Sequence, residues 1–279
     1  QCSGSSPLLF AKDQLYRTLD ATRRTFLARA TAGAFNEYGF IPDIIAMDHY
    51  AMFSAPSVIP GTWFTRVSDM EEALVYTQLL KANTEPRRMW AWCQFSFSNW
   101  SVQPEPWGVT YQFWSHILGG AKGILWFRYA PGDELLDRSS VIAQTALNEV
   151  AILNQVRELC LYGEPVNDVE TNGLPLLAGA LAGEKALVVI LVNNNYQRLG
   201  VPLLTTYRHS PVSGEVTVTV PDWISRQQVY RVLPEGATPV SAVVSGQQVT
   251  LPVDLDEDAG VYVIGEADTI PPDKPSRLN

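Results

Sequence analysis

Three apolar segments of the sequence, at residues 43–50, 88–95 and 123–129, each end in polar and aromatic side chains. Stretches with the helical spacing of apolar residues separate them. In a parallel α/β barrel the strands are buried on both faces and read as apolar runs, and the chemistry collects where the strands end. The groups at these ends are carboxylate, amide, imidazole, guanidinium and indole. This mixture suits a carbohydrate better than a phosphate, a nucleotide or a metal.

Asp48 is the first candidate for catalysis. It stands near the end of an apolar segment, where burying an acidic group is costly unless the group has a partner or a role. It could accept hydrogen bonds from sugar hydroxyls, act as a general base, or orient a neighbouring Arg or His. Cleavage of a glycoside needs two carboxyl groups roughly 5 to 10 Å apart. Within this chain the contributors to consider are Asp48, Glu37, Asp133 and Glu134.

Six side chains near the segment ends are candidates for binding a sugar: Tyr50, Trp90, Trp92, Gln94, Trp126 and Arg128. Indole rings stack on the apolar faces of pyranoses, and a buried indole N–H needs an acceptor. On a regular strand Trp90, Trp92 and Gln94 share one face, which is either the inside of a barrel or the side that packs on helices. For any one Trp, core packing is the competing interpretation. Arg128 offers a planar fork to hydroxyls or to a carboxylate, or forms a salt bridge with an acidic neighbour.

The composition excludes several classes of partner. The 279 residues are 46% hydrophobic and 18% charged, with a net charge of −9. No Lys/Arg cluster stands out, so we expect no nucleic-acid partner. No apolar run approaches the roughly 20 residues of a membrane span, so we expect no membrane partner. Cys2, Cys93 and Cys160 lack metal-ligand spacing, and we expect no metal and no other cofactor.

The first part of the chain, residues 1–164, alternates strand and helix signals. This alternation is typical of an α/β fold with a parallel sheet, and we expect strands at 25–30, 43–50, 88–95 and 123–129. A closed (β/α)8 barrel needs eight strands and typically about 250 residues. The stretch therefore predicts a partial barrel of about four βα units, half of a TIM-type barrel.

Residues 165–266 carry a different pattern, in which short runs rich in β-branched residues alternate with turn residues. This pattern is typical of an antiparallel β-sandwich domain. The expected strands are 174–181, 186–192, 215–220, 228–233, 240–244, 248–253 and 260–264. The tail, 267–279, contains three prolines and is predicted to be disordered.

Three motifs occur in an order that resembles a known family. Residues 18–25 read Thr-Leu-Asp-Ala-Thr-Arg-Arg-Thr, residues 43–50 read Asp-Ile-Ile-Ala-Met-Asp-His-Tyr, and residues 119–129 read Gly-Gly-Ala-Lys-Gly-Ile-Leu-Trp-Phe-Arg-Tyr. They resemble, in turn, the Leu-Asp-Pro-Thr-Arg-Pro segment before a middle barrel strand, the strand after it, and the last strand of (β/α)8 glycoside hydrolases of the β-galactosidase and β-glucuronidase type. Ala21 and Arg24 depart from the family's prolines. The resemblance implies that strands five to eight are present.

The resemblance also implies where the catalytic carboxylates lie. The family's general acid is a Glu at the end of strand four, which would precede Gln1. We therefore expect this chain to be a fragment, with an N-terminal barrel half in the full-length protein. If the strand count is off by one, Asn36-Glu37 becomes the family's Asn-Glu motif and Glu37 the acid/base. The family's nucleophile is a Glu at the end of strand seven, where this chain has Gln94. Gln cannot ionise, so it cannot be a carboxylate nucleophile.

Two functions remain open from the sequence. The first is a glycoside hydrolase acting on a carbohydrate, and the second is a non-catalytic, carbohydrate-binding, glycosidase-like protein. A pair of carboxylates facing one cleft would favour the first, whereas Gln94 favours the second. A purely structural role would leave the polar residues at the strand ends unexplained.

Overall fold

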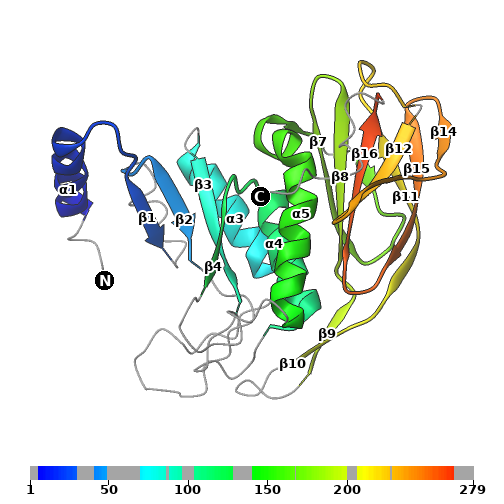
Figure 1. The fold of residues 1–279 in the computed structure, drawn as a ribbon, viewed down its shortest axis with the longest axis horizontal. Coiled ribbons are helices and arrows are strands. Elements are labelled where there is room, and N and C mark those ends of the chain that lie inside the picture. Colours follow the sequence, from blue (N-terminus) through cyan, green and yellow to red (C-terminus); the bar gives the residue numbers. More distant parts are fainter. Residues whose placement is uncertain are drawn as a thin grey trace.

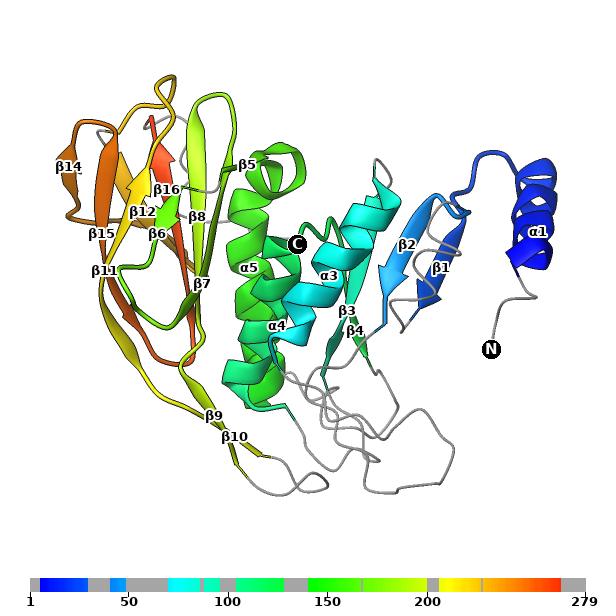
Figure 2. The ribbon, with the colours of Figure 1, turned by 180° about the vertical axis from the view of Figure 1, so that it is seen from behind.

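The computed structural model describes a layered arrangement of sheets and helices. It describes residues 6–29, 41–48, 70–85, 88–95, 104–127, 140–166, 168–199, 206–226 and 228–266. Within these ranges a parallel sheet lies on one side of a layer of helices, and antiparallel sheets lie on the other (Figure 1). The view from behind shows the same order of layers (Figure 2).

The parallel sheet contains four strands in the order of the chain. The strands are β1 (Phe26–Arg29), β2 (Ile44–Met47), β3 (Arg88–Gln94) and β4 (Ile124–Phe127). Each lies within a segment expected from the sequence, so the four predicted parallel strands are confirmed. Parallel neighbours need a crossover connection, and α3 (Glu72–Thr84) and α4 (Pro106–Leu118) lie within two of these connections.

Helices α3 and α4 cover one face of the parallel sheet. Ile45 and Met47 of β2 and Met89 and Ala91 of β3 are buried in one cluster with Leu80 of α3. Alternate residues of a strand point to opposite faces. The intervening residues of β2 and β3 therefore lie on the face that these helices do not cover.

Helix α4 is buried on all sides. Every residue from Trp107 to Ile117 is buried, because the helix lies between β3 and two strands of an antiparallel sheet, β8 (Ala186–Asn193) and β16 (Ala259–Gly265). Apolar residues all round a helix are typical of such a position. Pro106 is favoured at the first helical position, and Gly119 follows the last helical residue, Leu118.

Helix α5 (Val141–Tyr162) packs beside α4. The Ser140 side chain accepts a hydrogen bond from the Ala143 N–H at 3.1 Å, and Gly163 follows the last residue. Ser is favoured at this position because its hydroxyl satisfies an otherwise unpaired N–H of the first turn.

A buried carboxylate joins the two helices. Glu149 of α5 is 4% exposed and accepts hydrogen bonds from Thr110 Oγ1 at 2.5 Å and from Trp114 Nε1 at 2.6 Å, both in α4. Each carboxylate oxygen thus has a donor. Burial nevertheless raises the pKa of Glu149, with the two hydrogen bonds acting in the opposite direction.

The described residues from 164 to 266 form two larger antiparallel sheets that pack face to face, and a small hairpin. Val189 and Leu191 of one sheet and Val216 and Leu251 of the other are fully buried in the core between them. The strand orders are β13-β12-β16-β8-β7-β5 and β14-β15-β11-β6, with β10-β9 as the hairpin. The remaining strands are β5 (Glu164–Val166), β6 (Val169–Glu170), β7 (Leu176–Ala182), β9 (Tyr196–Leu199), β10 (Thr206–His209), β11 (Val212–Thr219), β12 (Gln228–Leu233), β13 (Gly236–Pro239), β14 (Val243–Ser245) and β15 (Gln248–Leu255).

The longer strands of this part overlap the runs expected from the sequence. Five short strands, of two to four residues each, were not predicted: β5, β6, β9, β10 and β13. Such short strands carry too little alternation to stand out from the turns around them. The predicted disordered tail, 267–279, lies outside the described residues.

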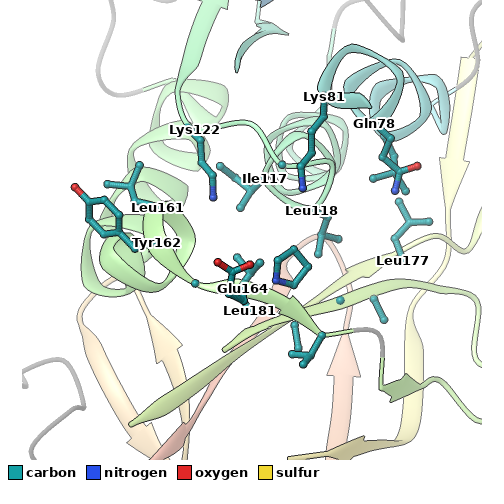
Figure 3. A pocket seen from close by; sticks show the side chains of 18 of the residues that line it. Gln78, Lys81, Ile117, Leu118, Lys122, Leu161, Tyr162, Glu164, Leu177 and Leu181 are labelled. Carbon is teal, nitrogen blue, oxygen red and sulfur yellow. The ribbon is translucent and has the colours of Figure 1, made fainter. Parts of the chain in front are cut away.

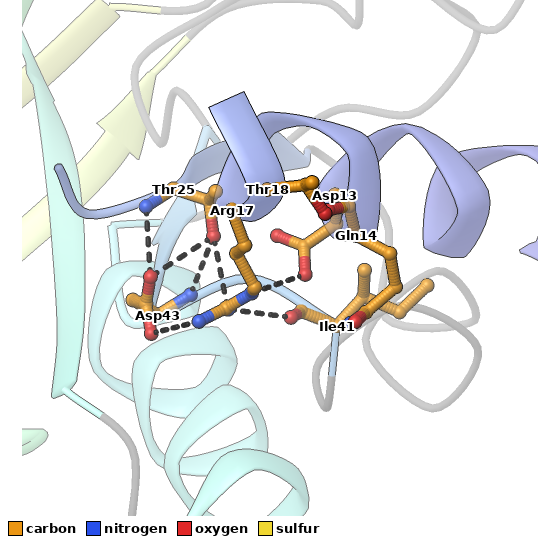
Figure 4. A network of polar contacts seen from close by, with 7 residues as sticks. All are labelled: Asp13, Gln14, Arg17, Thr18, Thr25, Ile41 and Asp43. Atoms are coloured by element: carbon orange, nitrogen blue, oxygen red, sulfur yellow. Dashed lines mark hydrogen bonds and ion pairs between the residues drawn. The ribbon is translucent and has the colours of Figure 1, made fainter. Parts of the chain in front are cut away.

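Helix α1 (Ser6–Leu19) is tied to the parallel sheet through Arg17. The guanidinium donates to Asp13 Oδ2 at 2.6 Å, to Asp43 Oδ1 at 3.0 Å and to Thr25 Oγ1 at 3.2 Å (Figure 4). The Thr25 N–H donates to Asp43 Oδ2 at 2.9 Å, and this bond, together with Arg17, lowers the pKa of Asp43. The network joins the beginnings of β1 and β2, so Asp43 has a structural partner at the amino end of the sheet.

We expect Glu149 to make folding stability depend on pH. Its folded-state pKa is raised, so the folded chain keeps this proton at pH values where the unfolded chain has lost it. Stability contributed by the protonated form is fully present below the ordinary value of 4.5 and is lost as pH rises through the folded-state pKa. Relative to Glu149→Gln, the wild-type chain should therefore lose stability between pH 4.5 and the raised pKa, as measured by urea unfolding across this window.

The exposed Glu158 of α5 provides a matched control. Glu158→Gln should leave the pH profile of the wild-type chain unchanged. A stability difference between wild type and Glu149→Gln that stays constant with pH would contradict the role given to Glu149.

Candidate functional site

The strand register brings Asp48, Trp92 and Gln94 to the same face of the parallel sheet. Met47 pairs with Ala91, so the residues that follow them are Asp48 and Trp92. Both are out of phase with the helix-facing residues, and Gln94 follows Trp92 by two positions. The question that the sequence left open is thereby answered. Trp90, Trp92 and Gln94 lie on the face opposite α3.

Phe127 joins this cluster from β4. Gln94 pairs with Phe127 in the parallel register, and paired residues of neighbouring strands point to the same side. The rings of Trp92 and Phe127 meet edge to face, with centroids 6.1 Å apart. Phe127 was not among the residues predicted from the sequence. Its position directly after Trp126 was the available signal. Neighbouring residues on a strand point to opposite faces, so if Trp126 faces the helices, Phe127 faces the other side.

Trp90 lies on the same face but nearer the amino end of the sheet. It pairs with Ala46 of β2, and its ring contacts Phe26 of β1 with centroids 5.9 Å apart. The two small residues Ala28 and Ala46, which pair with each other, leave room beside it. Trp90 therefore lies next to the cluster of Asp48, Trp92, Gln94 and Phe127, on the same face of the sheet.

Two polar atoms of the cluster are buried and have no hydrogen-bond partner among the residues that the structure describes. They are Asp48 Oδ1 and Trp92 Nε1. A buried polar atom left unpaired costs about 1 to 3 kcal/mol, and folded proteins rarely tolerate it without a reason. The carboxylate oxygen of Asp48 can accept a hydrogen bond, and the indole N–H of Trp92 can donate one. A ligand with hydroxyl groups would satisfy both.

The main chain at Gln94 is held from the helix layer. The Gln94 N–H donates to Gln112 Oε1 of α4 at 3.1 Å, and Gln112 Nε2 donates to the Gly108 carbonyl at 3.1 Å. Gln94 itself is fully buried. The end of β3 is thus fixed by a side chain that sequence reasoning did not single out, because a Gln on a helix gives no sign of the strand it will reach.

The structure does not bring Trp126 together with the cluster. Cys93 pairs with Trp126 in the parallel register, so Trp126 shares the helix-facing side with Cys93. Its ring stacks on Phe113 of α4, with centroids 5.7 Å apart and planes 10° apart. Phe95 also contacts it, with centroids 5.2 Å apart. Trp126 serves the core between the sheet and the helices.

Several predicted site residues cannot be placed. Glu37, Tyr50 and Arg128 lie outside the described residues, as do Asp133 and Glu134. Asp48 is the one catalytic candidate from the sequence that the described ranges contain.

The described residues contain no group of three His, Cys, Asp or Glu side chains that could hold a metal ion. Cys93 and Cys160 are buried free thiols. Burial raises the pKa of both, that of Cys160 to about 12, so neither is a ready thiolate. None of the helices in the described ranges is long and apolar enough to cross a membrane.

The chain matches no family model and no curated protein. Among solved structures, the noncanonic maltogenic α-amylase AmyB from Thermotoga neapolitana matches over 92% of this chain and 59% of its own, with 8% identity and a TM-score of 0.48. An α-amylase from Anoxybacillus matches over 93% of this chain and 56% of its own, with 12% identity and a TM-score of 0.48.

A third match is weaker. The α-L-fucosidase isoenzyme 2 from Paenibacillus thiaminolyticus matches over 47% of this chain and 19% of its own, with 16% identity and a TM-score of 0.29. This chain therefore spans less than two thirds of each of these proteins, and TM-scores below 0.5 establish neither a shared fold nor a shared activity.

We expect Trp92 and Trp114 to respond differently to the same substitution. Trp114→Phe removes the donor to Glu149 Oε2, whereas Trp92→Phe removes an N–H that has no acceptor in the described residues. Both variants lose the same ring atoms. Trp114→Phe should therefore lower the free energy of unfolding by about 1 to 3 kcal/mol more than Trp92→Phe, measured by urea denaturation of each variant without ligand. Equal losses would mean that the Trp92 N–H is already paired in the folded chain.

Proposed function

We propose that this chain is part of a glycoside hydrolase-like protein and binds a carbohydrate at the carboxyl ends of β2, β3 and β4. The observation that carries the proposal is the pair of buried, unpartnered atoms Asp48 Oδ1 and Trp92 Nε1. Sugar hydroxyls both donate and accept hydrogen bonds, so one sugar ring can satisfy the carboxylate and the indole together. The rings of Trp92 and Phe127 beside them suit the apolar face of a pyranose.

We interpret the parallel sheet as strands five to eight of a (β/α)8 barrel. Within the described residues β1 and β4 are each paired along one edge only, and an unpaired edge is a liability that proteins usually cover. Four further strands from an N-terminal half would pair both edges. They would also enclose the face that carries Trp92, so that Asp48 and Gln94 stand at the mouth of the barrel, where such enzymes hold their active sites.

The same interpretation divides the chain into two domains. Residues 1–164 form the half-barrel, and residues 165–266 form an antiparallel β-sandwich. The two face-to-face sheets with their shared core support the second assignment.

Gln94 separates the two functions that the site supports. Hydrolysis by the usual mechanism needs two carboxyl groups, and Gln94, at the position of the family's nucleophile, supplies an amide. Its main chain is fixed by Gln112 and its side chain is buried, so it belongs to the framework of the site. We therefore propose carbohydrate binding for this chain by itself. Hydrolysis belongs to the full-length protein, if a carboxylate from the upstream half or Glu37 completes the pair.

Binding can be tested on the full 279-residue chain. A glycan array identifies the sugar, and titration calorimetry then measures its affinity for three variants. Asp48→Asn should weaken binding about tenfold, because it replaces a charged acceptor with a neutral amide. Trp92→Phe should weaken binding about two- to tenfold, because it removes one neutral donor.

Trp223 provides the matched control for Trp92. It is 67% exposed and its Nε1 donates to the Gly183 carbonyl at 3.2 Å, far along the chain from the strand ends. Trp223→Phe should leave the affinity unchanged. The proposal fails if no glycan on the array binds, or if Trp223→Phe weakens binding as much as Trp92→Phe does.

We expect the isolated chain to be inactive on aryl glycosides. The reason is that Asp48 is the one catalytic candidate in the part of the chain that the structure describes, and one acidic group cannot serve both as acid and as nucleophile in the same step. The measurement is release of the aryl group from a set of nitrophenyl glycosides. Turnover that disappears in Asp48→Asn would show that this chain alone holds a complete catalytic pair, contrary to the assignment of hydrolysis to a longer protein.

A further inference from the structure

A cavity of about 470 Å³ lies between the helix layer and the six-stranded sheet. Its walls come from α3, the end of α4, the end of α5, and strands β5 and β7 (Figure 3). The volume falls within the roughly 300 to 1,000 Å³ of typical small-molecule sites. Lys81 lies in the last turn of α3, before β3, and Lys122 lies two residues before β4, so the cavity lies at the amino ends of the strands. It is thus separate from the site of Asp48 and Trp92.

Two lysines direct their ammonium groups into this cavity. Figure 3 shows the side chains of Lys81 and Lys122 pointing into the same space from neighbouring walls. Lys122 Nζ donates to the Cys160 carbonyl in the last turn of α5 at 2.7 Å, which leaves two of its three N–H groups for another acceptor. Burial, and after it the charge of Lys81, lower the pKa of Lys122, whereas Cys160 and Glu164 act in the opposite direction.

Gly120 allows Lys81 to reach this position. Its φ is +98°, a conformation that other residues rarely adopt. A Cβ atom on Gly120 would lie 2.7 Å from Lys81 Cδ and 3.5 Å from Lys81 Nζ. The lysine stem thus passes directly over the glycine, only two residues before Lys122. This turn therefore holds the Lys81 stem and Lys122 on neighbouring walls of the cavity.

The rest of the wall combines apolar side chains with two exposed carboxylates. Leu118, Leu177 and Leu181 line it. Glu85 lies 3.5 Å from Lys81 Nζ but its side chain is 61% exposed, and an exposed pair of this kind is worth little. Glu164 lies on the far wall and is also exposed. Neither carboxylate occupies the space between the two lysines in a buried pair, so an incoming anion can compete for them.

We propose that this cavity binds a small organic anion, with its carboxylate or phosphate group between Lys81 and Lys122 and a short apolar body against Leu118 and Leu177. Charge-assisted hydrogen bonds from two ammonium groups suit an oxyanion, and the leucines suit a chain of a few carbons. The proposal is independent of the carbohydrate site, because it uses none of the residues at the carboxyl ends of the strands.

Titration calorimetry on the full chain tests this site with two probes, hexanoate and inorganic phosphate. We expect saturable binding of at least one probe, which identifies the preferred headgroup. Lys81→Met and Lys122→Met should each weaken that binding about tenfold or more, whereas Lys81→Arg should retain it. Leu177→Trp fills the apolar end without altering either lysine. It should abolish hexanoate binding while leaving phosphate binding intact.

Lys12→Met, on the exposed surface of α1, is the matched control and should bind like the wild-type chain. Circular dichroism melting of each variant shows whether it is folded, and the Leu177→Trp and Lys81→Met variants test the site if Lys122→Met does not fold. No saturable binding of either probe up to about 10 mM overturns the proposal. So does binding that is unaffected by Lys81→Met, or that Lys12→Met weakens equally.

Discussion

The structure depends on the complete burial of helix α4. A helix that packs on both sides has no solvated face, so most polar side chains on it need a partner within the protein. Thr110 and Trp114 donate to Glu149 of α5, and Gln112 accepts from the main chain of Gln94 in β3. These bonds hold α5 and the end of β3 to the same helix. The position of the candidate site follows from that attachment.

The face of the parallel sheet away from α4 also carries buried polar atoms. Asp48 Oδ1 and Trp92 Nε1 are unpaired there among the described residues, and Ser115 Oγ of α4 is unpaired one layer away. Thr110, Gln112 and Trp114 of the helix layer fix the framework through their hydrogen bonds. Asp48 and Trp92 differ in lying next to each other on neighbouring strands, and this proximity is the basis of the proposed binding site.

Strand β3 shows how much of this arrangement the sequence could predict. Its bounds and the shared face of Trp90, Trp92 and Gln94 followed from apolar content and alternation alone. Which face of the sheet they occupy depends on where α3 packs. The face on which Trp126 lies depends on the register between β3 and β4. Both are set by contacts between distant parts of the chain, which local sequence patterns do not show. For the same reason, the sequence does not show that a second sheet covers the other side of α4.

The change of pattern near residue 164 divides the sequence but not the hydrophobic core. Trp107 and Phe113 of α4 belong to one cluster with Val188 and Ile190 of β8, and Trp107 Nε1 donates to the Asn193 carbonyl at 3.3 Å. Separating the chain at this boundary would expose apolar surface on both pieces. Neither part is therefore expected to fold well alone, and recombination during evolution could exchange one of them only for a replacement whose surface already fits the other.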